Sequence, residues 1–306
     1  MSKVLYFLKH AGIKIGLFLQ SNWAYLLWGA LHFTLAYFVL RQIFYEGQTA
    51  LLYTSIIYGV SLAFALSPAG EWIVRSLEGG RPIQTIADKE YLLPIFEEVY
   101  GEAIEVTPSI CRRIKLYISE EKTVNGFALG RNTIVLTRGA VKSLRTEELK
   151  GILAHEFGHM ANGDTKASLL TIVGNGFFSV IIVCCRFIAR LFEVFAVLIS
   201  SGDATIAQIV GLAIRFLARL LFDYAVTMFL FLGDVILALN SRFSEYLADN
   251  YAFQIGYGEQ LKDALILLNK MDMGGRMKLK ELLKASHPYT TARIGRLERK
   301  LGLEVE

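Results

Sequence analysis

Two histidines and a glutamate near the middle of the chain have the spacing of a catalytic metal site. His155 and His159 are four positions apart, so on a helix both imidazoles leave the same face and can bind one metal ion. Glu156 follows the first histidine and can take a proton from a water on that ion. Residues 152–161 contain no proline and no charge other than Glu156, as a buried active-site helix requires. This pattern favours a zinc site with Glu156 as the general base.

A catalytic zinc takes three protein ligands, and the third does not closely follow the two histidines. A second helical segment, residues 240–249, contains Glu245 and Asp249, again four apart on one face. Glu245 could complete the metal site, and Asp249 could orient a ligand histidine by a hydrogen bond. Asp164 and His287 remain the alternatives for the third ligand.

The sequence also predicts the secondary structure around these residues. Thr146 is expected to cap the helix that carries the histidines, with Glu147 and Glu148 in its first turn. Residues 132–137 are rich in β-branched side chains and predict a strand. The small residues within 125–130 would let a substrate backbone approach and pair as an added strand, although an ordinary hairpin turn is the alternative.

The composition indicates a membrane protein. Hydrophobic residues make up 54% of the 306 residues and charged residues only 20%, and the mean hydropathy is +0.42. A soluble domain has about 45–50% apolar and about 25% charged residues. The net charge of +4 is too small for a nucleic-acid-binding surface, and three cysteines without a spacing pattern argue against a disulfide scaffold.

The hydropathy pattern divides the chain into four parts. Residues 15–40 and 47–70 carry no formal charge and are long enough to cross a bilayer. Residues 167–239 are apolar apart from four arginines and four acids, which either pair inside a helix bundle or mark where the helices leave the lipid. We therefore expect a membrane region at 1–70 with spans at about 18–40 and 50–69, the first part of a polar domain at 71–166, a membrane hairpin at 167–239, and the second part of the polar domain at 240–306.

The short loops predict the orientation. The first fourteen residues contain Lys3, Lys9 and Lys14 and no acid, whereas the loops expected on the other side carry little positive charge. By the positive-inside rule, both termini and the polar domain lie in the cytoplasm, on a multi-pass protein of the inner or plasma membrane.

At these motifs the sequence resembles the integral-membrane zinc metallopeptidases of the HtpX type, which are gluzincins related to the CAAX prenyl proteases. The resemblance covers nearly the whole chain: two N-terminal spans, His-Glu-x-x-His, a hydrophobic hairpin, Glu-x-x-x-Asp and a basic tail. Residues 125–130 look like the family's Asn-Ala-Phe-Ala-Thr-Gly segment, differing at Gly126 and Leu129. His287-Pro288, followed by Arg293-Ile294, looks like its C-terminal His-Pro motif.

This resemblance implies the fold, the cofactor and the site. The expected fold is mostly α-helical with a small β-sheet, with about four transmembrane helices and a cytoplasmic gluzincin-like zinc protease domain. One zinc ion would be bound by His155, His159 and Glu245, with Glu156 as the base. His287 would donate to the oxyanion or occlude the zinc in a resting state, the alternative being that it serves only as a surface cap. The remaining candidate site residues are Asn125, Gly126, Phe127 and Ala128 for substrate binding, Asp249 behind a ligand, and Arg293.

The implied activity is zinc-dependent cleavage of misfolded membrane proteins in quality control. The partners are then the bilayer and these substrates; since the chain has no Walker P-loop, any ATP-driven extraction must come from a partner such as an ATP-dependent membrane protease. One alternative is a prenyl-protein protease, although that relative has more spans. The other is a catalytically silent membrane chaperone or scaffold with structural zinc, against which the intact Glu156 argues.

Overall fold

The structure, a computed structural model, describes most of the chain but not all of it. Its described residues are 22–38, 40–41, 44, 46–108, 110, 113–174, 206–272 and 290–303. The expected hairpin tip, most of the first hairpin helix, and His287 lie outside them. The labelled elements are α2 (Gly47–Ala65), α3 (Pro68–Leu77), β1 (Arg81–Pro82), α4 (Ile86–Val106), β2 (Lys115–Ser119), β3 (Gly126–Leu129), β4 (Thr133–Thr137), α5 (Arg138–Ser143), α6 (Thr146–Asn162), α7 (Asp164–Leu169), the π-helix η1 (Leu170–Gly174), α9 (Ile206–Gln254), α10 (Gly258–Asp272) and α12 (Thr290–Lys300). The expectation of a mostly helical fold with a small sheet is confirmed.

The four-stranded sheet has the order β1-β2-β4-β3 and mixed pairing. β2 and β4 are parallel, whereas β1 and β3 each pair antiparallel with their neighbour. β4 is buried along its whole length, while every residue of β3 is half-buried, because β3 is an edge strand with one side unpaired in the sheet. The strand expected at 132–137 is thus confirmed as β4, and 126–129 forms a strand rather than a turn.

Helix α6 is the central element of the polar domain. It packs against α4, α9, α10 and β3. On its inner side Phe157 is fully buried and its ring stacks with that of Tyr100 at 5.5 Å between centroids. Its cap is Arg145 and not Thr146: the Arg145 backbone N–H donates to the Glu148 carboxylate at 2.7 Å, which closes the first turn one residue earlier than expected.

Two glycines let α6 approach its neighbours closely. A Cβ atom on Gly151 would lie 2.4 Å from the backbone nitrogen of Leu261 in α10. A Cβ atom on Gly158 would lie 2.8 Å from the Cα of Ala248 in α9. The two glycines are seven positions apart, about two helical turns, so they share one face of α6. Glycine at these positions brings α9 and α10 into backbone contact with the helix of the histidines.

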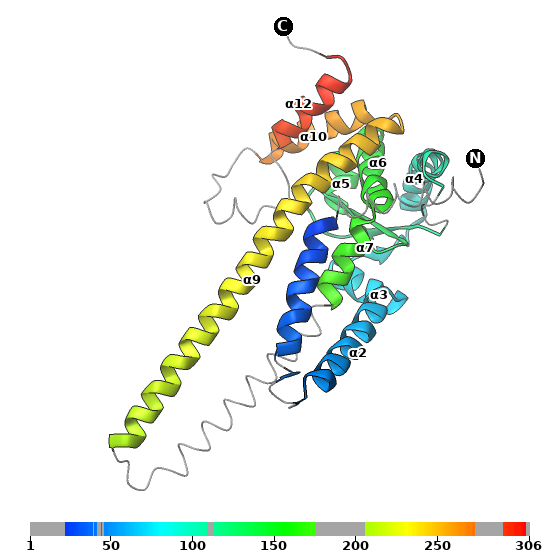
Figure 1. The fold of residues 1–306 in the computed structure, drawn as a ribbon. Helices are drawn as coiled ribbons and strands as arrows, with labels where there is room; N and C mark the ends of the chain where they lie inside the picture. The colour runs from blue at the N-terminus through cyan, green and yellow to red at the C-terminus, as the bar shows by residue number, and fades with distance from the viewer. Residues whose placement is uncertain are drawn as a thin grey trace, which may run out of the picture.

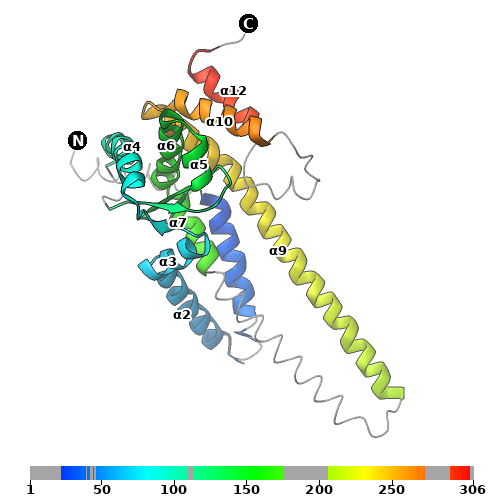
Figure 2. The same cartoon turned by 180° about the vertical axis from the view of Figure 1, so that it is seen from behind.

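A group of long helices projects from one side of this domain (Figure 1). Helix α9 runs without a break through the expected boundary at residue 240, and its 49 residues rise about 73 Å. The first helix, residues 22–38, lies between α9 and α2 in both views (Figure 2), and its Trp28 ring packs on Phe229 of α9 at 4.7 Å. Among the described residues, α2 is the one helix that is long and apolar enough to cross a membrane.

The outward face of α2 is more apolar than its inward face. The buried positions recur every three or four residues and are mostly small or polar: Ala50, Thr54, Tyr58, Ser61 and Ala65. The exposed large side chains are apolar or aromatic: Leu51, Leu52, Tyr53, Ile56, Val60, Leu62 and Phe64. Helices in lipid have this distribution, because small residues allow close helix packing while apolar side chains face the acyl chains.

Candidate metal centre

The two histidines and the glutamate of the motif are all brought into the interior by α6. His155 and Glu156 are buried, and His159 is half-buried one turn further along. The helix ends directly after this turn at Gly163, whose φ of 81° is a left-handed conformation that glycine adopts without strain. The histidine rings therefore sit in the last two turns of the helix, next to the segment that follows it.

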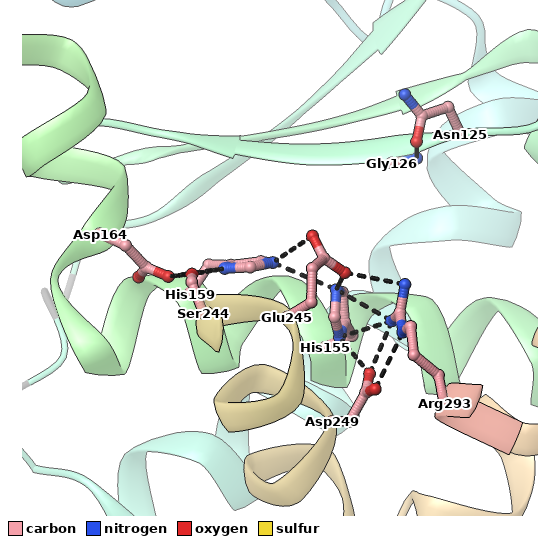
Figure 3. Close-up of polar contacts among 9 residues, drawn as sticks. All are labelled: Asn125, Gly126, His155, His159, Asp164, Ser244, Glu245, Asp249 and Arg293. Carbon is pink, nitrogen blue, oxygen red and sulfur yellow. Dashed lines mark hydrogen bonds and ion pairs between the residues drawn. The ribbon is translucent and has the colours of Figure 1, made fainter. Parts of the chain in front are cut away.

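Helix α9 supplies the two acids of the second motif. Glu245 and Asp249 are buried on the face of α9 that touches α6, at the level of the Gly158–Ala248 contact. This return of α9 to α6 places the second motif beside the first, although the chain between them contains the expected membrane hairpin. Figure 3 shows Glu245 directed between the two histidine rings, with Asp249 one turn below.

The potential ligand atoms converge on one point. The Nε2 atoms of His155 and His159 are 3.1 Å apart, and the carboxylate of Glu245 lies 3.2 Å from the first and 3.6 Å from the second. Tetrahedral ligands at zinc-binding distance are about 3.3 Å from one another. Two imidazole nitrogens and one carboxylate oxygen are also the donors of a catalytic zinc site. Both the donor set and its spacing fit a zinc ion, and among the described residues this is the one such group that could hold a metal.

Each histidine is oriented by an aspartate on its other nitrogen. The Nδ1 atom of His155 lies 3.0 Å from Asp249, and the Nδ1 atom of His159 lies 2.8 Å from Asp164. These contacts favour the tautomer with the proton on Nδ1, which leaves Nε2 free to bind a metal. Asp164 also accepts a hydrogen bond from the hydroxyl of Ser244, so it joins α7 to α9 beside the site.

The contact of Asp164 with His159 was not predicted from the sequence. The sequence suggested it as an alternative third ligand, but its carboxylate contacts the far nitrogen of His159 and not the convergence point. The signal was present, because an acid directly after a helix-ending glycine lies close to the last turn of that helix. His287, the other alternative, lies outside the described residues.

Arg293 of α12 neutralises the two acids of α9. Its guanidinium forms ion pairs with Glu245 at 2.8 Å and with Asp249 at 2.6 Å, and all three side chains are buried. Burial opposes ionisation of both acids, but Arg293 and His155 outweigh it, so the pKa of Glu245 lies well below its usual range and that of Asp249 is lowered. Both groups therefore remain carboxylates at neutral pH, as a ligand and an orienting acceptor must.

The pKa values of the two histidines are shifted in the opposite direction, upward. Burial alone would lower the pKa of His159, but Asp164 and Glu245 raise it well above its usual value. The pKa of His155 is also raised, because Glu245 and Asp249 outweigh burial and the charge of Arg293. A metal ion that binds at Nε2 replaces these protons. The surrounding carboxylates therefore favour a bound cation at this position.

Glu156 lies beneath the edge strand β3. Burial is the main cause that raises its pKa, whereas the nearby His159 and His155 are the chief opposing causes and the backbone N–H of Ala128 opposes the rise to a smaller extent. A cavity opens between β3 and the histidines, lined by Asn125, Gly126, Phe127 and Ala128 among others. The four candidate substrate-binding residues thus line the same cavity as the metal cluster (Figure 3 shows the first two).

Comparisons with known proteins agree with this geometry. Residues 94–301 match Peptidase family M48. Protease HtpX of Shewanella oneidensis is 26% identical over 270 residues, which cover 81% of this chain and 88% of that protein. The Protease HtpX homolog of Halobacterium salinarum is 30% identical over 232 residues, covering 72% of this chain and 68% of that protein.

A solved structure shares the fold. The crystal structure of S. mikatae Ste24p aligns with a TM-score of 0.50 at 20% identity, covering 97% of this chain. This chain spans only 66% of Ste24p. The family match over more than half of the sequence, together with the assembled metal cluster, leads to one conclusion: the chain belongs to peptidase family M48, as a metallopeptidase of the HtpX type.

Proposed function

We propose that this protein is a membrane-anchored, zinc-dependent endopeptidase that cleaves misfolded membrane proteins. One observation carries the proposal: His155, His159 and Glu245 converge on one point, with Glu156 buried beside them under an open strand edge. A structural zinc site has no need of an ionisable base next to its ligands.

Each residue near the cluster has a defined task in peptide hydrolysis. The zinc ion would supply Lewis acidity, polarising the scissile carbonyl and lowering the pKa of a bound water. Glu156 takes the proton from the attacking water and returns it to the leaving nitrogen, a role for which a raised pKa suits a carboxylate. Asp249 and Asp164 hold the imidazoles in position, and Arg293 keeps Glu245 ionised.

The open edge of β3 suits an extended peptide. The backbone N–H of Thr137 donates to the carbonyl of Asn125 at 3.0 Å, so by alternation Phe127 and Leu129 also bond to β4. The backbone groups of Gly126 and Ala128 then face the open edge. Their carbonyls can then pair with a substrate strand. Such strand pairing recognises the backbone of the substrate rather than its side chains, which suits unfolded substrates of varied sequence.

The membrane setting rests on the helices that project from the domain. The outward apolar face of α2, the long α9 and the uncharged runs of the sequence support a multi-pass protein of about four spans. The lysines before the first run support a cytoplasmic active site. Reporters fused after Glu306 and inserted near Arg112 should both report the cytoplasm; disagreement between them would overturn the four-span arrangement.

The function is tested by purified protein in detergent, with Glu156→Gln as the matched variant. The amide keeps the size of the side chain but cannot take a proton, so we expect one zinc per chain in both proteins and cleavage of casein or an unfolded membrane protein by the wild type alone. Chelation should abolish cleavage and zinc should restore it. Full zinc without cleavage by the wild type would instead favour a silent scaffold, and cleavage confined to prenylated peptides would favour a prenyl-protein protease.

The same variant can identify the substrates. Membrane proteins that copurify with Glu156→Gln but not with wild type are candidates for the natural substrates. An ATP-dependent membrane protease among them would support the proposed partnership in quality control. Recovery of folded, soluble proteins only would contradict it.

A further inference from the structure

A buried acid outside the metal cluster holds the turn that joins β3 to β4. Glu71 lies in the first turn of α3, and only 8% of its surface is exposed. Its carboxylate accepts hydrogen bonds from the backbone N–H groups of Arg131 and Asn132, each at 3.2 Å, and from the hydroxyl of Thr133 at 2.5 Å. A buried carboxylate is stable only with such a set of donors, so both its oxygens are committed to this turn.

The turn is built around this carboxylate. Gly130 begins it with a φ of 55°, and a Cβ atom there would lie 2.6 Å from an oxygen of Glu71. On the opposite side, the Thr165 hydroxyl of α7 donates to the Gly130 carbonyl at 2.8 Å. The turn is therefore held by α3, which follows the candidate span α2, and by α7, which follows the histidine helix.

Strand β3 has limited support from the sheet itself. It has only four residues and a single partner in the sheet, and its open edge covers Glu156. The close approach of Gly126 to Ile152 of α6, 2.9 Å for an added Cβ atom, fixes its other end. The turn that Glu71 holds therefore determines how far the C-terminal end of β3 lies from Glu156 and the metal ligands.

We propose that Glu71 is a positioning residue for the substrate: by holding the β3–β4 turn it keeps the edge strand where an extended peptide must pair. This proposal rests on the proposed peptidase function. It predicts that loss of the carboxylate impairs substrates long enough to pair with β3, because displacements of about 1 Å can cost about a hundredfold in rate. Short substrates, which need only the metal and Glu156, should be affected little.

The test is Glu71→Gln, in which the amide NH2 cannot accept from a backbone N–H. The control is Glu78→Gln, an exposed glutamate at the end of the same helix. Cleavage of a ten-residue fluorogenic peptide is compared with that of a blocked tetrapeptide, together with zinc content and Tm. For Glu71→Gln we expect kcat/KM to fall about tenfold on the long peptide, mainly through KM, and less than about threefold on the short one, with full zinc.

Two further variants keep the proposal testable if Glu71→Gln does not fold. Thr133→Val and Thr165→Val each remove one contact of the same turn at nearly constant volume, and both should shift the long-to-short ratio in the same direction. Equal losses on both peptides, or no loss on either, would overturn the positioning role. If the wild type cleaves neither peptide, the proposed function fails as well, whereas an active wild type with an unchanged ratio in the variants refutes only the role of Glu71.

Discussion

Replacing Gly158 by alanine would push apart the two helices that hold the metal ligands. The added Cβ atom would lie 2.8 Å from the Cα atom and 2.9 Å from the carbonyl oxygen of Ala248. Both are backbone atoms of α9, so no side chain can rotate away. Gly158 neighbours His159, and Ala248 is one helical turn from Glu245, so any separation is transmitted directly to the ligand set.

The size of the shift follows from these distances. Carbon atoms in contact are about 3.5–4.0 Å apart, so the two helices must separate by about 0.7 Å. A metal site tolerates about 0.2 Å in its ligand distances, and the displacement is about three times as large. We therefore expect zinc affinity to fall by at least about tenfold. The free energy of unfolding should change less, because about 1–3 kcal/mol of overpacking is partly offset by about 1 kcal/mol of helix propensity.

The assay is zinc affinity, measured by chelator competition on purified protein, with thermal unfolding and peptide cleavage alongside. Gly101→Ala is the control, since Gly101 is exposed within α4 and has open space where its Cβ atom would lie. That variant should bind zinc as the wild type does and gain up to about 1 kcal/mol. Wild-type zinc affinity in Gly158→Ala would refute the claim that this contact sets the ligand geometry.

Three further predictions follow from the site. Asp249→Ala and Asp164→Ala should each weaken zinc binding by roughly 10–100-fold in chelator competition, because each removes the acceptor that orients a ligand histidine; unchanged affinity in either would remove that aspartate from its role. Activity should fall as the pH drops through the pKa of Glu156, which burial raises above 4.5, because the base must be ionised; a rate that stays flat down to pH 4.5 in a pH profile would contradict this. Phe157→Ala should lower the free energy of unfolding by about 3–5 kcal/mol in denaturant titration, since its ring is fully buried, and a cost below about 1 kcal/mol would be inconsistent with that burial.

The parts of the site that depend on local spacing could be predicted from the sequence. His155, Glu156 and His159 lie on one helix, where spacing alone determines the shared face. Glu245 could be proposed because an apolar out-and-back segment returns the chain to its starting point. The strand at 132–137 followed from its β-branched residues.

Other contacts between distant segments could not be predicted in this way. Glu71 meets the turn at Arg131, and Arg293 meets Asp249, only because whole helices pack at particular distances. The residue types of Glu71 and Arg293 do not indicate their partners, since glutamate and arginine are equally common on the solvent-exposed face of a helix. The continuity of α9 also went unanticipated, because the change from apolar to polar residues near 240 alters the surroundings of a helix without breaking it.

We infer that Glu245, from a different helix, completes a catalytic zinc site with His155 and His159. Its most direct test is the zinc affinity of Glu245→Ala, compared with Glu259→Ala, an exposed glutamate of α10. We expect the control to bind one zinc as the wild type does, and Glu245→Ala to lose more than about a hundredfold in affinity, beyond the effect of removing an orienting residue. If Glu245→Ala binds zinc as tightly as the wild type, the third ligand lies elsewhere and Glu245 does not belong to the metal site.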